Sequence, residues 1–131
     1  MAWNTRIVPE HRFVEMTYTG MVPPAELTAS VAEAGRLMSE AHLTCLLADC
    51  SELLGGHSVF DLYYLAEAMA GTSRIHSLRE AVVLPKMKNA AETAAFWETT
   101  ASIRGLDVQA FATRAEALAW LCSPAGATRA A

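Results

Sequence analysis

The sequence predicts an α/β fold with a single mixed, mostly parallel sheet and the element order β-β-α-β-α-β-α-β-α. Three observations lead to this prediction. Two short strand patterns lie on either side of a tight turn near the start of the chain. Beyond them, apolar runs too short for helices alternate with longer helical patterns. The chain has 131 residues, of which 53% are hydrophobic, and this suits one domain with its own core.

The chain begins with two strands that are expected to pair as an antiparallel hairpin. The first strand is predicted at 3–8 and the second at 12–18, with Pro9-Glu10-His11 as the turn between them. A connection this short joins neighbouring antiparallel strands. Gly20 is expected to break the second strand.

A long helix and a buried strand are expected next. Pro23 and Pro24 open the helix, where the missing N–H of proline costs nothing. The apolar residues of the helix recur at steps of three and four, which places them on one stripe: Leu27, Val31, Ala34, Met38 and Ala41. The run at 44–48 is almost wholly apolar, which predicts a central strand covered on both faces.

The second predicted helix, at 58–70, is apolar nearly all round. Such a helix is either deeply packed or part of an interface. Its large apolar residues are Val59, Phe60, Leu62, Tyr63, Leu65 and Met69. Another buried strand is expected at 81–84, where Pro85 follows and ends it.

The remaining elements complete the alternation. A third helix is expected at 90–103, with Gly105 as the left-handed residue beyond its end. A more polar strand at 107–111 is expected at a sheet edge, followed by a short helix at 115–122. The sequence therefore predicts one domain over residues 1–122 and a flexible C-terminal tail over 123–131.

Three helices carry the same start signal, the capping box. In this pattern an N-cap side chain and an acidic side chain three residues later each accept a hydrogen bond from the other residue's backbone N–H. The three predicted boxes are Ser58-x-x-Asp61, Asn89-x-x-Glu92 and Thr113-x-x-Glu116.

Composition and charge exclude several functions. The net charge is −4 and no stretch clusters Lys and Arg, so neither nucleic acid nor an anionic membrane surface is expected as a partner. No uncharged apolar run approaches the roughly 20 residues of a membrane span. The cysteines are odd in number and two of them lie in or beside an apolar strand, which predicts reduced thiols in the cytoplasm: Cys45, Cys50 and Cys122. They form no Cys-x-x-Cys pair, which disfavours a disulfide or a zinc site. The sequence predicts no metal site and no cofactor.

The segment between the third strand and the second helix is the predicted functional site. It combines a buried strand, a polar exit, a glycine hinge and a capped helix start. In an open α/β sheet, ligands and partners dock at such junctions. The residues predicted to form the site are Asp49, Ser51, Gly56, His57, Ser58 and Asp61.

Several short motifs follow one another in a characteristic order along the chain. They are Tyr18-x-Gly20, Leu46-Leu47-Ala48-Asp49, Asp61-Leu62-Tyr63, Ala81-Val82-Val83, Arg104-Gly105, Val108-x-x-Phe111 and Glu116-Ala117-Leu118-Ala119-Trp120-Leu121. Their order and spacing resemble the STAS fold of anti-sigma-factor antagonists. The chain looks similar to the small bacterial proteins called SpoIIAA-like or STAS/SEC14-like. The resemblance implies the same fold and a bacterial origin.

The resemblance also suggests a role for Ser58. In the anti-sigma-factor antagonists, a serine at the start of the second helix is phosphorylated by a partner kinase, so Ser58 is the candidate phosphoacceptor. Here His57 replaces the usual acid before the serine, and no glycine follows it. The capping box explains Ser58 without any modification.

We therefore expect a non-enzymatic STAS-like protein-interaction or regulatory module. Its partner would be another protein or a second copy of the chain, bound through an apolar contact face on the second helix: Phe60, Tyr63 and Tyr64. The alternative is a carrier or sensor of a small apolar or anionic ligand, as in the SEC14 relatives, with a pocket beside the same helix. A phospho-switch at Ser58 and an enzyme are the remaining alternatives.

Overall fold

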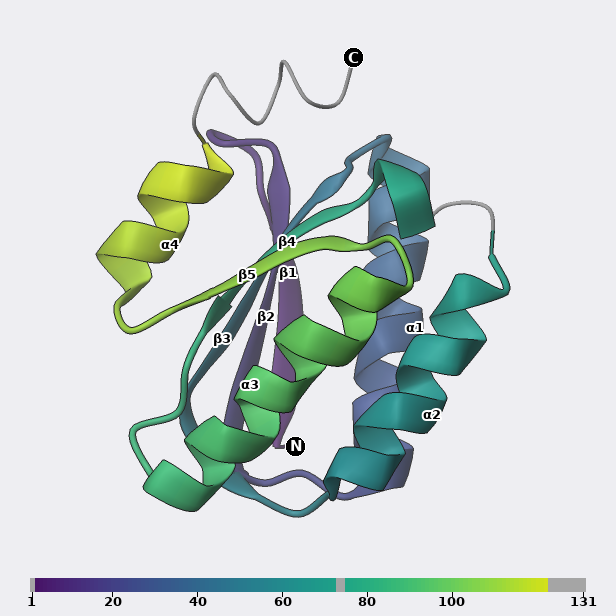
Figure 1. Ribbon diagram of the computed structural model, residues 1–131. Helices are drawn as coiled ribbons and strands as arrows, with labels where there is room; N and C mark the ends of the chain where they lie inside the picture. Colours follow the sequence, from purple (N-terminus) through teal and green to yellow (C-terminus); the bar gives the residue numbers. More distant parts are fainter. Residues whose placement is uncertain (1, 73–74, 123–131) are drawn as a thin grey trace.

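Five strands form one sheet in which the spatial order of the strands is their order along the chain (Figure 1). A computed structural model describes residues 2–72 and 75–122, so the predicted tail at 123–131 lies outside the described residues. The strands are β1 (Trp3–Val8), β2 (Phe13–Met21), β3 (Cys45–Gly55), β4 (Arg79–Val83) and β5 (Asp107–Phe111). The helices of the described part are α1 (Pro24–Ala41), α2 (Val59–Ala70), α3 (Lys88–Ile103) and α4 (Arg114–Leu121), with a 3₁₀ turn at Ile75–Ser77.

The predicted fold class is confirmed by the strand pairing. β1 and β2 run antiparallel, with Val8 opposite Phe13 at the turn. The pairs β2–β3, β3–β4 and β4–β5 are all parallel, because a helix connects the two strands of each pair. β5 lies at the sheet edge, as its more polar sequence predicts.

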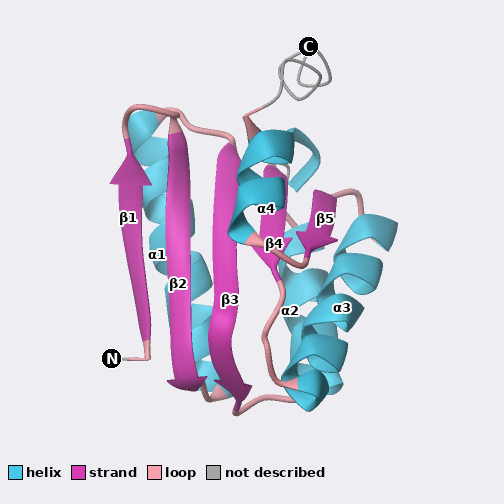
Figure 2. Cartoon of the chain, turned by 90° about the vertical axis from the view of Figure 1, so that its left-hand side faces the viewer, coloured by secondary structure: helices cyan, strands magenta, loops and turns pink. Residues whose placement is uncertain are grey.

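The helices are divided unequally between the two faces of the sheet. α1, α2 and α3 lie on one side and α4 lies alone on the other (Figure 1). Turned by 90°, the α4 side shows α4 in front of the β3–β5 half of the sheet, with no helix in front of β1 and β2 (Figure 2). Two separate hydrophobic clusters result, a larger one under α1, α2 and α3 and a smaller one under α4.

β2 and β3 are both longer than the sequence predicts. β2 continues through Gly20 to Met21, so the expected break at Gly20 is wrong. Gly20 has φ +69°, which glycine adopts without strain, and it stays paired with Leu53. Residues 49–51, where the sequence predicts that the chain leaves the third strand, also lie inside β3. The pairing of β2 with β3 shifts register twice along this stretch.

One of the three predicted capping boxes forms in full, at Ser58, and a second forms as a one-sided cap, at Thr113. Ser58 Oγ accepts from the Asp61 N–H at 3.3 Å, and Asp61 Oδ2 accepts from the Ser58 N–H at 2.8 Å. Thr113 Oγ1 accepts from the Glu116 N–H at 3.2 Å. The prediction for Asn89 is wrong: α3 already begins at Lys88 after Met87, so Asn89 lies inside the first turn, and no side chain caps the helix.

Candidate functional site

α2 is the helix of its layer that lies farthest from the sheet (Figure 1). It packs mainly against α3, whereas α1 packs directly on β1 and β2. Only Leu62 and Ala66 of α2 are fully buried. The space between α2 and the sheet is therefore filled less completely than the rest of the interior.

Two adjoining cavities, both partly open to the surface, occupy this space, with volumes of about 60 Å³ and about 190 Å³. Both are lined by Met16 of β2, Val31 of α1, Glu80 of β4 and Trp97 of α3, which places them side by side. The smaller cavity extends toward the start of α2, where Leu62 lines it, and the larger one extends toward Met69. Nearly all of their lining side chains are apolar.

Glu80 is the one carboxylate among the described residues that line these cavities. Alternation along β4 directs Glu80 and Val82 toward α1–α3, and Arg79 toward α4. Trp97 Nε1 donates to Glu80 Oε1 at 2.7 Å. Burial raises the pKa of Glu80 to about 7, although this hydrogen bond lowers it in part. The carboxyl group therefore changes charge near neutral pH inside an apolar space.

Tyr18 and Cys50 are two further polar groups at the smaller cavity. The Tyr18 hydroxyl lies 2.7 Å from Ser30 Oγ, which donates to the Leu27 carbonyl at 2.7 Å. Burial raises the pKa of Tyr18. Burial also raises the pKa of Cys50, and the nearby Glu80 carboxylate adds to this effect. Cys50 is therefore a buried thiol rather than an activated nucleophile.

The hinge between β3 and α2 is fastened to the start of α1. The Val22 N–H donates to the Gly55 carbonyl at 2.8 Å, and His57 Nδ1 lies 2.9 Å from the Val22 carbonyl oxygen. Gly56 has φ +107°, and a Cβ at this position would lie 2.5 Å from the Val22 nitrogen. Only glycine fits here, which explains the glycine hinge in the sequence.

The residues predicted to form one polar site lie in two places. His57, Ser58 and Asp61 stay together at the hinge and the start of α2, with His57 lining the smaller cavity. Asp49 and Ser51 lie on the other face of the sheet, under α4. Asp49 Oδ1 accepts from Ser51 Oγ at 2.7 Å, and its Oδ2 lies 3.2 Å from Arg114 Nη1.

Arg114 joins Asp49 to a second acid on that face. Its guanidinium also pairs with Glu15, a buried residue of β2. Arg6 of β1 donates to the other oxygen of Glu15 at 3.0 Å. These ion pairs link β1, β2, β3 and α4, so they account for Asp49 as part of the connection between α4 and the sheet.

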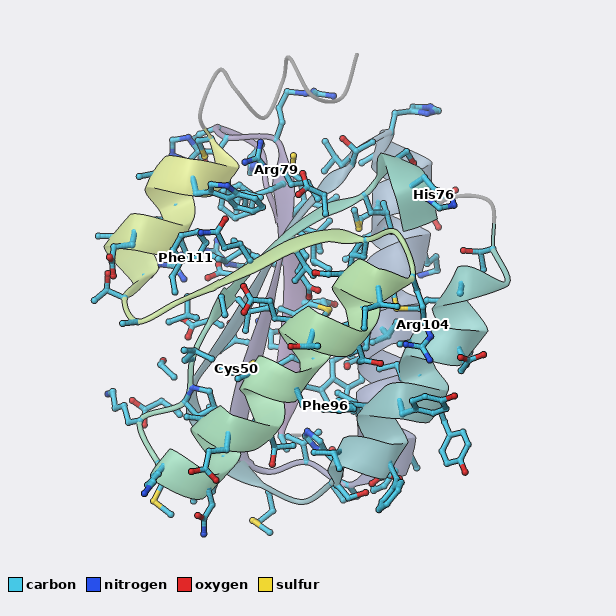
Figure 3. All side chains as sticks on the ribbon, in the orientation of Figure 1. Cys50, His76, Arg79, Phe96, Arg104 and Phe111 are labelled. Atoms are coloured by element: carbon cyan, nitrogen blue, oxygen red, sulfur yellow. The ribbon has the colours of Figure 1, made fainter. Side chains whose placement is uncertain are left out.

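The predicted apolar contact face on α2 is exposed. Phe60 is 70% exposed, Tyr64 is 67% exposed, and Tyr63 packs edge-on against Tyr64. Arg104, at the end of α3, extends toward α2 (Figure 3). There it lies over the Tyr63 ring and donates to Glu67 at 3.0 Å.

Residues 2–72 and 75–122 contain neither a metal-binding cluster nor a membrane-spanning helix. In this part of the chain, no group of three or more His, Cys, Asp or Glu side chains could hold a metal ion. None of its helices has the length and apolar character needed to cross a bilayer.

The pair formed by Glu80 and Trp97 is not predicted by the sequence patterns. One signal was present: Glu80 is an acid directly before the apolar run 81–84 of a strand predicted to be covered on both faces. In such a strand an acid must be buried, so it requires a hydrogen-bond partner or a function. The partner, Trp97, lies in another element, and no local pattern connects the two residues.

Comparison with known proteins supports the fold. No protein-family model matches the chain, and no curated protein sequence matches it. The structure resembles the crystal structure of an uncharacterized protein from the DUF3478 family with a SpoIIAA-like fold, from Shewanella loihica. The TM-score is 0.55 at 16% identity, over 92% of this chain and 93% of the other. The SpoIIAA/STAS-like fold expected from the motifs is thereby confirmed.

Proposed function

We propose that this protein is a non-enzymatic binding protein that carries or senses a small apolar molecule in the cavities between the sheet and α1–α3. The observation that carries the proposal is the larger cavity, of about 190 Å³, beside a second of about 60 Å³. Interiors are normally packed with few voids larger than a water molecule. In another protein, an engineered apolar cavity of about 150 Å³ binds benzene.

The arrangement of α2 supports the same proposal. Leu62, Leu65 and Met69 of α2 line the cavities, yet α2 makes few close contacts with the sheet. Leu62 belongs to the larger hydrophobic cluster, so opening α2 would separate side chains of that cluster but would leave the strand pairing unbroken. A ligand can then enter beside α2 while the sheet stays intact.

Two groups at the smaller cavity are not activated as nucleophiles. They are Tyr18 and Cys50, and burial raises the pKa of both. A protonated thiol and a protonated phenol are poor nucleophiles.

The experiment compares benzene binding by the parent protein with that of two matched α1 variants. Ala34 lines the larger cavity and is buried, whereas Ala32 is exposed on the same helix. Benzene should shift NMR resonances of Met16, Met38 and Met69 and raise the melting temperature, because it binds the folded state alone. Ala34→Leu should abolish both effects and Ala32→Leu should leave them unchanged. Circular dichroism checks that Ala34→Leu is folded. No shift in the parent protein would contradict the proposal.

A second candidate function, contact with another protein chain through α2, is favoured by the exposure of Phe60 and Tyr64. Large exposed aromatics that lie together are typical of interaction surfaces. Because α2 is also the outer wall of the cavities, both roles would use the same helix. Sedimentation velocity on the parent protein and on a Phe60→Ser/Tyr64→Ser variant tests the case in which the partner is a second copy. Phosphorylation of Ser58, an exposed residue at the start of α2, stays a prediction.

A further inference from the structure

We infer that the ligand is a small apolar amine whose ammonium group pairs with the Glu80 carboxylate. This inference rests on the proposed function and adds the chemical class of the ligand. It follows from the position of one buried acid in a space that otherwise offers apolar contacts.

The first step is the hydrogen bonding of Glu80. Its side chain lines both cavities and is 4% exposed. Among the described residues, Trp97 supplies the one hydrogen bond that reaches this carboxyl group, and that bond goes to Oε1. The second oxygen therefore retains its capacity to bind a donor. Oε2 is not among the fully buried, unpartnered side-chain atoms of the described residues, so it is open to the cavity, where a ligand donor can reach it.

The second step is the charge of the surroundings. No Lys or Arg is among the described residues that line either cavity. The nearest arginine along the chain, Arg79, points to the opposite face, where it stacks on Trp120. On α2, Glu67 is paired with Arg104. An ammonium group would neutralise Glu80, whereas a carboxylate would add a second negative charge to a space whose described lining contains no Lys or Arg.

The third step concerns the remaining titratable groups that face the cavity with Glu80. They are Tyr18 of β2, Cys50 of β3 and His57 of the hinge. Tyr18 is bonded to Ser30 and His57 to the Val22 carbonyl. Burial raises the pKa of Tyr18 and of Cys50, so both groups stay protonated and neutral at the pH values of the experiment. Glu80 is thus the group that provides the negative charge for an amine.

The pH dependence follows from the ionisation of Glu80. The empty site ionises with a pKa of about 7, and a bound ammonium group lowers that value. Affinity for an amine is therefore fully present above pH 7 and falls as the pH decreases below it. The expected decrease approaches about tenfold per pH unit, because each unit well below the pKa reduces the ionised fraction of the free site about tenfold.

The test uses four probes of similar size: ethylbenzene, benzyl alcohol, benzylamine and benzoate. Dissociation constants are measured by NMR titration at pH 8 and pH 5.5, on the parent protein and on Glu80→Gln. Glutamine keeps the size and an acceptor for Trp97 Nε1 but loses the charge. Glu67→Gln on the outside of α2 is the matched control. If ethylbenzene still binds a variant, the cavity of that variant is intact.

The expected result is that the parent protein at pH 8 binds benzylamine at least tenfold more tightly than ethylbenzene or benzyl alcohol, and does not bind benzoate. The preference should disappear at pH 5.5 and in Glu80→Gln, and should persist in Glu67→Gln. If ethylbenzene binds but benzylamine shows no preference, or keeps it in Glu80→Gln, the inference is overturned and the proposed function stands. If no probe binds the parent protein, both are overturned.

Discussion

Trp97 Nε1 donates a hydrogen bond of 2.7 Å to Oε1 of Glu80, and this bond joins α3 to the inner face of β4. The two residues are 17 positions apart along the chain and belong to different elements. A carboxyl group buried among apolar side chains costs free energy whenever it is ionised. Because the hydrogen bond favours the ionised form and burial disfavours it, the pair determines how stability depends on pH.

The first prediction is that the protein loses stability as the pH rises from 4.5 to 7. Burial raises the pKa of Glu80 from 4.5 to about 7, so over this range the unfolded chain ionises while the folded chain retains its proton. The folded state binds more protons, and the free energy of unfolding must then fall with pH, by about 3 kcal/mol in total. Urea unfolding at pH 5 and pH 8 measures the change.

Glu80→Gln is the control for that prediction, because its side chain does not titrate. The difference between pH 5 and pH 8 should be smaller in this variant by about 3 kcal/mol. An equal pH dependence in both proteins would show that Glu80 is not the group responsible.

The second prediction concerns Trp97→Phe, which removes the indole donor and keeps an aromatic ring. The Glu80 carboxylate then loses its hydrogen bond, and the expected cost is about 1–3 kcal/mol at pH 8. At pH 5 the carboxyl group is protonated and the cost should be smaller. Combining Trp97→Phe with Glu80→Gln in a double-mutant cycle separates the hydrogen bond from the change in packing.

The third prediction compares two residues that look alike in the sequence. Ser58→Ala should lower the free energy of unfolding by about 0.5–2 kcal/mol, because Ser58 Oγ accepts from the Asp61 N–H. Asn89→Ala should not reduce stability, because Asn89 does not cap α3. Thermal unfolding of both variants decides the matter, and equal losses would contradict the helix start observed at Lys88.

The fourth prediction compares two glycines. Gly56→Ala should be strongly destabilising, since φ is +107° and the new Cβ would lie 2.5 Å from the Val22 nitrogen. In α1, Gly35→Ala should stabilise by about 0.5–1 kcal/mol, because the site is helical and has no atom within 4 Å of the new Cβ. Denaturant unfolding of the two variants should give changes of opposite sign.

The sequence predicts well what depends on neighbouring residues. The cap at Ser58, the first strand and the positive φ of Gly105 are all local, and all agree with the structure. The elements α1 to α4 begin within two residues of the predicted positions for the same reason. Helix caps, helix starts and turn glycines depend on residues within one or two turns of the chain, so a single sequence is enough to predict them.

What the sequence could not predict depends on pairing between distant segments. β3 extends to Gly55 because β2 runs beside it as far as Met21, and no alternation in either segment reveals this. The same extension separates Asp49 from Ser58, which the sequence places only nine positions apart. Asp49 faces α4 and pairs with Arg114, which is 65 residues away. The cavities have no sequence signature, because residues from every layer on that side line them.

The contacts of Gly55 and His57 with Val22 have a consequence for how fast a ligand binds and leaves. One end of α2 is tied to the start of α1, so opening must begin at the opposite end, where Glu67 is paired with Arg104. A ligand would enter and leave through the same opened state. Removing the ion pair with Glu67→Gln should therefore accelerate association and dissociation equally. The dissociation constant would stay the same while the residence time becomes shorter.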